Sequence, residues 1–186
     1  MNQRRSFLKS SVVMASALGL PALSRAADVT AAAAATAAEN ERTLRFYNTH
    51  TGESLRTIFW AEGQFIPDAL QDINKLLRDH RNNQIAQIDP QLLLLLDKVS
   101  AQFGSQNVLH VISGYRSPAT NAMLHEHSNG VAKHSMHMEG RAIDIRMPGQ
   151  DLAHLRKAAM SLRGGGVGYY PDSQFVHMDT GRVRYW

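Results

Sequence analysis

Two separate runs of the sequence contain the residue types that a catalytic metal ion needs. The first run places His137 and Asp144 seven positions apart, and the second run contributes His177. Two imidazoles and one carboxylate are the ligands that a catalytic zinc ion uses when it keeps its fourth position open for water. Zinc held in this way lowers the pKa of the water and polarises a carbonyl group. We therefore predict that His137, Asp144 and His177 bind one zinc ion in each chain.

The spacing of the first two residues excludes a continuous helix between them. Positions seven apart on a helix are separated by ~10 Å along its axis, whereas the ligands of one ion lie about 2 Å from it. Gly140 resolves the conflict, because glycine permits a tight change of direction. The chain can then return as a strand over residues 142–145, and residues 175–179 show the same alternation. If these strands are neighbours, Asp144 and His177 meet on one face of a sheet, and the third ligand arrives from the loop.

Most other histidines are expected to have ordinary roles. The chain has nine histidines, so any one of them is more often a surface or hydrogen-bonded residue than a ligand. We assign to that class His50, His80, His110, His125, His127 and His154. The three predicted ligands stand out through a joint pattern in a fixed order. A Gly-Tyr-Arg-Ser turn at 114–117 precedes a Ser-x-His-x2-Gly-x-Ala-x-Asp run at 135–144, and a Phe-Val-His-x-Asp run follows at 175–179.

With these motifs the sequence resembles the zinc D-alanyl-D-alanine peptidases and murein endopeptidases, which share the hedgehog/DD-peptidase fold. More narrowly, it resembles the periplasmic murein endopeptidases that are exported with a twin-arginine signal. The resemblance covers residues 44–186, and its specific motifs lie in 114–144 and 175–181. It implies the three zinc ligands already named and a contact between Arg116 and the substrate.

One position departs from the pattern of that family. Many members carry Glu or Asp three residues before the last ligand, and here that residue is Gln174. We expect Asp179 to be the general base, because it shares a strand face with His177 at a Cα distance of about 6.6 Å. The competing role for Asp179 is to orient a ligand imidazole by accepting its free N–H. Asp172 and His134 are the remaining candidates for the base.

Arg116 is expected at the end of a strand, where Ser117-Pro118 stiffens the following turn. A guanidinium fixed near the metal can bind a carboxylate through two parallel hydrogen bonds, or support an oxyanion. Peptidoglycan stem peptides carry such carboxylates at their D-alanine termini and on diaminopimelate. The alternative is a surface arginine in an intramolecular ion pair. We also expect Ser135 to fix its loop by hydrogen bonding.

Residues 1–26 have the features of a twin-arginine signal peptide. Paired arginines at positions 4 and 5 precede an apolar run over 12–23, and small residues follow at 24–26. The apolar run alone could also be a membrane anchor, but about a dozen residues is short for a span that needs ~20. We therefore expect export by the twin-arginine translocase, a mature protein in the periplasm and no stable membrane anchor after processing.

The composition of the chain excludes several other classes of protein. Four of the 20 basic residues lie in the signal, which leaves 16 basic against 16 acidic residues. The high isoelectric point is therefore no evidence for nucleic-acid binding. The chain has no cysteine, so neither a disulfide nor a lipid on cysteine is expected. Residues 27–42 contain five consecutive alanines and are expected to be a tether. We expect a monomer.

Residues 43–186 are expected to form one α+β domain, with a small, mainly antiparallel sheet and flanking helices. Residues 44–48 and 54–60 predict a β-hairpin. Helices are predicted over 68–81, from Asp89-Pro90 through the leucine run 92–96, over 119–125 up to a stop at 128–130, and over 151–163. Further strands are predicted at 108–115, 142–145, 166–170 and 175–179.

The predicted function is that of a periplasmic zinc metallopeptidase that hydrolyses peptide cross-links in peptidoglycan. The resemblance makes the link between two diaminopimelate residues a reasonable candidate for the bond that is cleaved. The spacing of the motif residues alone does not identify this bond. Two alternatives stay open at this point. One is a D,D-carboxypeptidase or dipeptidase that acts on uncross-linked stem peptides. The other is a wall-binding module without catalysis, which the departure at Gln174 allows.

Overall fold

The computed structural model describes residues 41–104, 106–127 and 131–186 of the chain. The expected signal peptide and nearly all of the expected tether lie outside the described residues, as does the predicted helix stop at 128–130. The first strand begins at Arg42, which is the last residue of the expected tether. Within the described ranges, no helix is both long enough and apolar enough to span a membrane.

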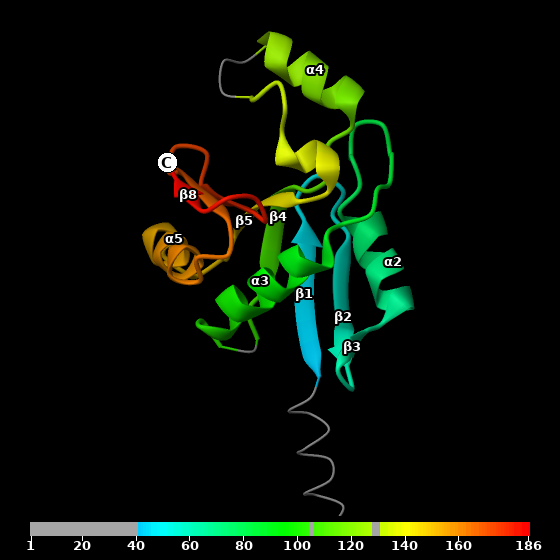
Figure 1. Ribbon diagram of the computed structural model, residues 1–186, viewed down its shortest axis with the longest axis vertical. Helices are drawn as coiled ribbons and strands as arrows, with labels where there is room; N and C mark the ends of the chain where they lie inside the picture. Colours follow the sequence, from blue (N-terminus) through cyan, green and yellow to red (C-terminus); the bar gives the residue numbers. More distant parts are fainter. Residues whose placement is uncertain (1–40, 105, 128–130) are drawn as a thin grey trace, which may run out of the picture. The chain divides into compact units, whose positions relative to one another are not determined.

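The strands of the described part form one eight-stranded sheet in the order β3-β2-β1-β4-β5-β7-β6-β8 (Figure 1). Their bounds are β1 Arg42–Asn48, β2 Ser54–Ala61, β3 Gln64–Phe65, β4 Leu109–Ser113, β5 Ala142–Arg146, β6 Gly166–Tyr170, β7 Phe175–Asp179 and β8 Arg184–Tyr185. Neighbouring strands are antiparallel except for the parallel pairs β1–β4 and β6–β8. The α+β class is confirmed, and short strands at both edges make the sheet larger than expected.

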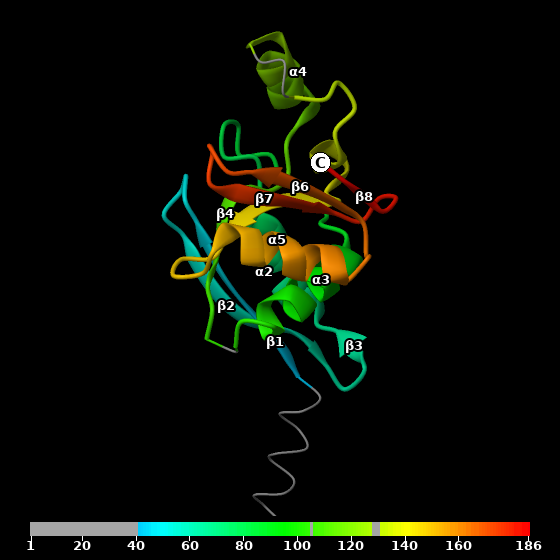
Figure 2. The same ribbon diagram turned by 90° about the vertical axis from the view of Figure 1, so that its left-hand side faces the viewer.

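Helices cover the sheet on the side that holds the hydrophobic core. Their bounds are α2 Pro67–Leu76, α3 Pro90–Ala101, α4 Pro118–His127 and α5 Leu152–Ser161, and a 3-10 helix, η1, spans Met136–Glu139. Apolar residues of α2, α3 and α5 join those of the strands in one buried cluster. Figures 1 and 2 both show α4 away from this core, at one end of the sheet. The core therefore lies between the sheet and α2, α3 and α5.

Two predicted elements show how side chains set the helix ends. The Asp89 side chain caps α3 by accepting a hydrogen bond from the backbone N–H of Gln91 at 2.9 Å, as predicted. Helix α2 ends at Leu76, five residues before the predicted end. The reason is Asp79, whose buried carboxylate accepts hydrogen bonds from the backbone N–H groups of Arg81 and Ser117. The chain therefore leaves the helix to make a turn that also holds the loop after β4.

The central strands β5 and β7 pair in a register that brings the two strand-borne ligand candidates together. Asp144 lies directly opposite His177 in this antiparallel pair. Ile143 and Met178 belong to the hydrophobic core. Because strand side chains alternate, Asp144 and His177 point to the opposite face of the sheet. The predicted pairing and the shared face are both observed.

Gly140 makes the turn between η1 and β5. Its φ of 66° is in the left-handed region, where residues with a Cβ are disfavoured. A Cβ at this position would also overlap the carbonyl oxygen of Gln87. Glycine is therefore required here for its backbone conformation and for the close approach of a second segment.

We predict that Gly140→Ala destabilises the protein more than Gly149→Ala does. Gly149 also has a positive φ, of 80°, but a Cβ there would meet no atom within 4 Å. The control variant should therefore lose only the ~1–2 kcal/mol of stability that a left-handed residue with a Cβ costs. Gly140→Ala should lose ~1–3 kcal/mol of stability more, because its Cβ overpacks the contact with Gln87. The free energy of unfolding in urea measures both. Equal losses would show that the contact with Gln87 does not constrain this turn.

Candidate metal centre

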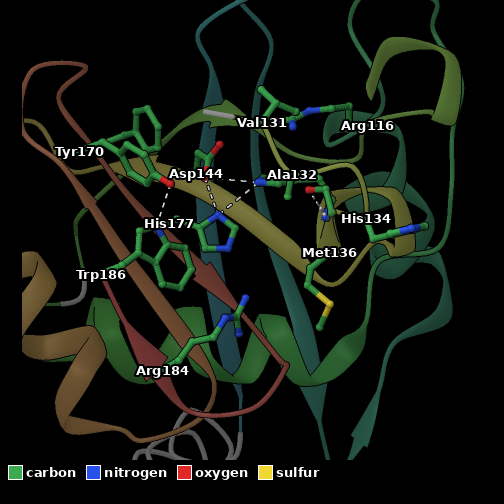
Figure 3. Close-up of a pocket in the computed structure, with 13 residues that line it drawn as sticks. Arg116, Val131, Ala132, His134, Met136, Asp144, Tyr170, His177, Arg184 and Trp186 are labelled. Atoms are coloured by element: carbon green, nitrogen blue, oxygen red, sulfur yellow. Dashed lines mark hydrogen bonds and ion pairs between the residues drawn. The ribbon is translucent and has the colours of Figure 1, made fainter. Parts of the chain in front are cut away.

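His137, Asp144 and His177 lie together in the structure, each of them buried, and come from η1, β5 and β7 (Figure 3). Asp144 Oδ1 is 2.8 Å from His177 Nδ1 and 3.3 Å from His137 Nε2. The two ring nitrogens are 3.3 Å apart. One atom from each side chain therefore points to a common centre.

One nitrogen of each imidazole ring forms a hydrogen bond outside the cluster. These hydrogen bonds determine which of the two ring nitrogens can bind a metal ion. His137 Nδ1 is 2.7 Å from the carbonyl oxygen of Gly114. A carbonyl can only accept, so Nδ1 donates and Nε2 keeps its lone pair toward the other two residues. His177 Nε2 likewise donates to the Asp179 carboxylate at 3.0 Å, which leaves Nδ1 facing inward. Partners of this kind orient the histidine ligands of metal ions in proteins.

The donor set fits a zinc ion. Zinc bonds to imidazole nitrogen and carboxylate oxygen at ~2.0–2.2 Å in a tetrahedral arrangement. Two ligand atoms on a tetrahedron of that size are separated by roughly 3.3 Å, close to the 2.8–3.3 Å found here. A set of three protein ligands would leave one tetrahedral position open, as in catalytic rather than structural zinc sites.

The pKa values of Asp144 and His177 reflect how closely the groups of this cluster are packed. Burial acts to raise the pKa of Asp144, but the imidazoles of His137 and His177 outweigh it and hold this pKa well below its ordinary value. Burial acts to lower the pKa of His177, but hydrogen bonds with Asp144 and Asp179 outweigh it and raise the pKa to about 9. A cation at this centre must therefore displace a proton from His177.

Asp179, the first candidate for the base, has its carboxylate fully engaged. Besides the N–H of His177, it accepts hydrogen bonds from the backbone N–H groups of Gly166 and Gly181. Arg184 donates to both carboxylate oxygens, at 3.0 and 2.7 Å. The Asp179 side chain is 0% exposed. This geometry suits the orienting role for Asp179 and leaves its oxygens no access to a substrate.

A cavity of about 200 Å³ opens in front of the three residues. Its lining consists of Arg116, Val131, Ala132, His134, Ser135, Met136, His137, Asp144, Tyr170, Phe175, His177, Arg184 and Trp186. Asp172 and Gln174 are exposed and do not line the cavity, and the Gln174 amide donates to the carbonyl oxygen of Pro171. Of the three base candidates, only His134 contributes to the lining.

Arg116 lines the cavity at the rim above the three donors (Figure 3). Its backbone N–H donates to the carbonyl oxygen of His137 at 3.1 Å, which ties the arginine loop to η1. The guanidinium makes 3.4 Å contacts with Ser113 and Asn121, and its buried Nε has no partner in the described part of the chain. Burial lowers the pKa of Arg116. No ion pair of Arg116 is found among the described residues, in contrast to the surface-arginine alternative.

The loop before η1 has the expected organisation. Ser135 caps η1 by accepting a hydrogen bond from the backbone N–H of His137. The other histidines lie outside the three-residue cluster. His50 and His80, for example, stack on each other with ring centroids 3.9 Å apart.

Three further residues of the site, Arg184, Tyr170 and Trp186, were not predicted from the sequence. Arg184 neutralises the carboxylate of Asp179, and the Trp186 ring lies 5.3 Å from that of His177. The spacing of two positions between Arg184 and Trp186 was the one signal in the sequence that could have placed them together, because alternate residues of a strand share a face. The last residues of the chain therefore complete the site.

The chain is similar to known proteins over most of its length. Residues 36–186 match the family described as peptidoglycan L,D-endopeptidase MepK, Peptidase_M15_2. The peptidoglycan L,D-endopeptidase MepK of Escherichia coli (strain K12) is 44% identical over 170 residues, which cover 91% of this chain and 93% of that protein. The probable peptidoglycan L,D-endopeptidase MepK of Haemophilus influenzae is 46% identical over 146 residues, 78% of each chain.

No solved structure gave a significant match. The family match nevertheless extends over the whole described domain, and the relative from Escherichia coli aligns along nearly its full length. The chain therefore belongs to the Peptidase_M15_2 family, the M15 peptidases described as peptidoglycan L,D-endopeptidase MepK.

Proposed function

We propose that this protein is a zinc-dependent peptidoglycan endopeptidase that hydrolyses peptide cross-links between murein stem peptides. The observation that carries the proposal is the pair of imidazole nitrogens and the carboxylate oxygen that converge within 3.3 Å beside a cavity. The L,D-endopeptidase relatives favour the bond between two diaminopimelate residues as the one that is cleaved. We also propose the hedgehog/DD-peptidase fold for the domain, which superposition of an experimental structure on that fold would test.

The residues that would hold the ion are His137 through Nε2, Asp144 through its carboxylate and His177 through Nδ1. When bound, zinc acts as a Lewis acid that lowers the pKa of water and polarises a carbonyl group. The protein residues then have to orient the peptide, accept a proton and protonate the leaving amine. The remaining groups of the cavity can be assigned to these tasks.

Arg116 is proposed to bind a substrate carboxylate. The side chain is held by a loop that is itself hydrogen-bonded to η1, so its position relative to the donors is fixed. The contacts of 3.4 Å with two neutral side chains are weak and leave the positive charge without a counterion among the described residues. A carboxylate of a stem peptide would supply that counterion through two parallel hydrogen bonds.

His134 is proposed as the group that takes the proton from water and passes it to the leaving amine. Apart from the three ligands, it is the one imidazole among the residues that line the cavity, and an imidazole can both accept and donate a proton. Figure 3 shows its ring directed away from the three donors. The proposal therefore requires rotation of the His134 side chain, which is exposed.

We further propose that the protein acts in the periplasm, where its substrate is found, after export through the twin-arginine translocase. The paired arginines at positions 4 and 5 support this route. Replacement of both by lysine should leave an unprocessed precursor in the cytoplasm, detected by cell fractionation and immunoblotting. Normal processing of this variant would indicate a different route.

His134→Gln and Asp179→Asn should impair the enzyme in different ways. His134→Gln removes the proposed proton carrier, so kcat should fall by about 10²-fold or more with zinc affinity unchanged. Asp179→Asn removes the partner of His177, so zinc affinity should fall roughly 10- to 100-fold, and added zinc should restore activity. Steady-state kinetics and zinc titrations on both variants measure these effects, with His154→Gln on α5 as the control.

The opposite pattern would contradict these assignments. A His134→Gln variant with normal kcat would exclude His134 as the proton carrier. An Asp179→Asn variant with normal zinc affinity and low kcat would instead return the base to Asp179, against the hydrogen bonding described above.

The proposed activity is tested with the mature protein and purified murein sacculi. Muropeptide dimers joined through two diaminopimelate residues should be converted to monomers, as measured by liquid chromatography and mass spectrometry. His137→Ala should release nothing, whereas His154→Ala, an exposed histidine outside the site, should retain activity. Release of D-alanine alone would identify a carboxypeptidase, and binding to sacculi without any product would identify a wall-binding module. Either result would refute the endopeptidase proposal.

A further inference from the structure

The last residue of the chain contacts the cavity through a specific hydrogen bond. The indole Nε1 of Trp186 donates to the hydroxyl oxygen of Tyr170 at 2.8 Å. Figure 3 shows both side chains on the side of the cavity opposite Arg116 and His134, next to Asp144 and His177. Neither residue has a role in the function proposed so far.

Trp186 is held in place although 45% of it is exposed. Its backbone N–H donates to Val167, and its carbonyl oxygen accepts from Tyr169, so the end of the chain is fixed to β6. The Arg184 guanidinium lies 4.9 Å from the centre of the Trp186 ring. A Cβ on Gly168 would come within 2.7 Å of the indole, which shows how closely the ring rests on the β6 backbone.

The ring of Tyr170 is fixed as well. It stacks on Phe175 with ring centroids 4.5 Å apart and an interplanar angle of 21°. Its hydroxyl can both donate and accept, whereas an indole N–H can only donate. Trp186 therefore occupies an acceptor site of the Tyr170 oxygen. The hydroxyl hydrogen has no acceptor among the described residues and is available to a ligand in the cavity.

We propose that Tyr170 donates this hydrogen to the scissile carbonyl oxygen of the substrate, and that Trp186 is a positioning residue that fixes the Tyr170 hydroxyl. The inference rests on the proposed peptidase function. Tyr170 keeps its proton throughout, and its hydrogen bond strengthens as the carbonyl oxygen gains negative charge. A donor that is fixed in advance is effective because it does not have to reorganise during the reaction.

This arrangement gives the cavity two walls with different tasks. Arg116 and His134 lie on one side and would bind the substrate carboxylate and carry the proton. Tyr170 and Trp186 lie on the other side and would stabilise the charge on the carbonyl oxygen. The alternative is that the two aromatic rings only provide an apolar surface against which the stem peptide packs.

A double-mutant cycle distinguishes these roles. Tyr170→Phe keeps the ring and should lower kcat about 10²-fold, the scale for loss of one such donor, with KM and zinc content unchanged. Trp186→Phe removes the N–H donor and keeps an aromatic ring, although a smaller one, and should lower kcat about tenfold, the scale of one neutral hydrogen bond. The double variant should be no slower than Tyr170→Phe, because Trp186 acts through Tyr170.

Other outcomes overturn the proposal. A kcat for Tyr170→Phe close to that of the wild type, or a change confined to KM, would leave the aromatic pair as an apolar wall. Effects that multiply in the double variant would mean that Trp186 does not act through Tyr170. If the wild-type protein releases no peptide from sacculi, the proposed function itself fails, and that result is separate from this inference.

A second measurement does not depend on activity. The chain has two tryptophans, so a Trp60→Phe background leaves Trp186 as the sole indole fluorophore. Adding Tyr170→Phe should shift its emission maximum, because the indole N–H loses its partner. An unchanged spectrum would show that the hydrogen bond is absent in solution. Trp60 lies on β2, outside the cavity, so Trp60→Phe alone should retain wild-type kcat.

Discussion

The rest of the structure depends on one constraint, which is that two imidazole lone pairs and a carboxylate must be held at one buried point. The two ring nitrogens and the carboxylate oxygen of these groups lie 2.8 to 3.3 Å from one another. Acceptors placed this closely repel each other unless a cation or a proton lies between them. The fold therefore has to hold together three groups that repel one another unless a cation or a proton is shared between them, and several of its features serve this purpose.

Each of the three groups is anchored from outside the centre. The carbonyl oxygen of Gly114 and the carboxylate of Asp179 set the rings of His137 and His177. The antiparallel register of β5 and β7 fixes Asp144 against His177. The left-handed turn at Gly140 brings η1 back over the sheet. Loss of any one anchor would leave a ligand less well oriented, which weakens a metal site.

Local patterns in the sequence were sufficient to predict the hairpin, the helices and the face shared by Asp144 and His177. The alternation of strand residues and the conformational freedom of Gly140 are properties of short segments. The environment of Asp179 could not be predicted in this way. It depends on Arg184 and on the backbone N–H of Gly166, which come from other strands.

The glycine run at 164–166 also has a role that local sequence patterns could not predict. The sequence suggested only a break after a helix. In the structure, a Cβ on Gly166 would overlap both the Asp179 carboxylate and Arg184. Glycine is therefore needed there so that the carboxylate can reach the backbone N–H. The roles of Trp186 and Tyr170 were likewise not evident, because they depend on a hydrogen bond between β6 and the residue that follows β8.

The central claim is that His137, Asp144 and His177 hold one zinc ion. Anomalous diffraction at the zinc edge, from crystals of the mature protein, tests it most directly. We expect one peak per chain at ~2.0–2.2 Å from His137 Nε2, an Asp144 oxygen and His177 Nδ1, with His177 Nε2 still bonded to Asp179. A peak at another site, or coordination through His177 Nε2 with the Asp179 contact broken, would contradict this account.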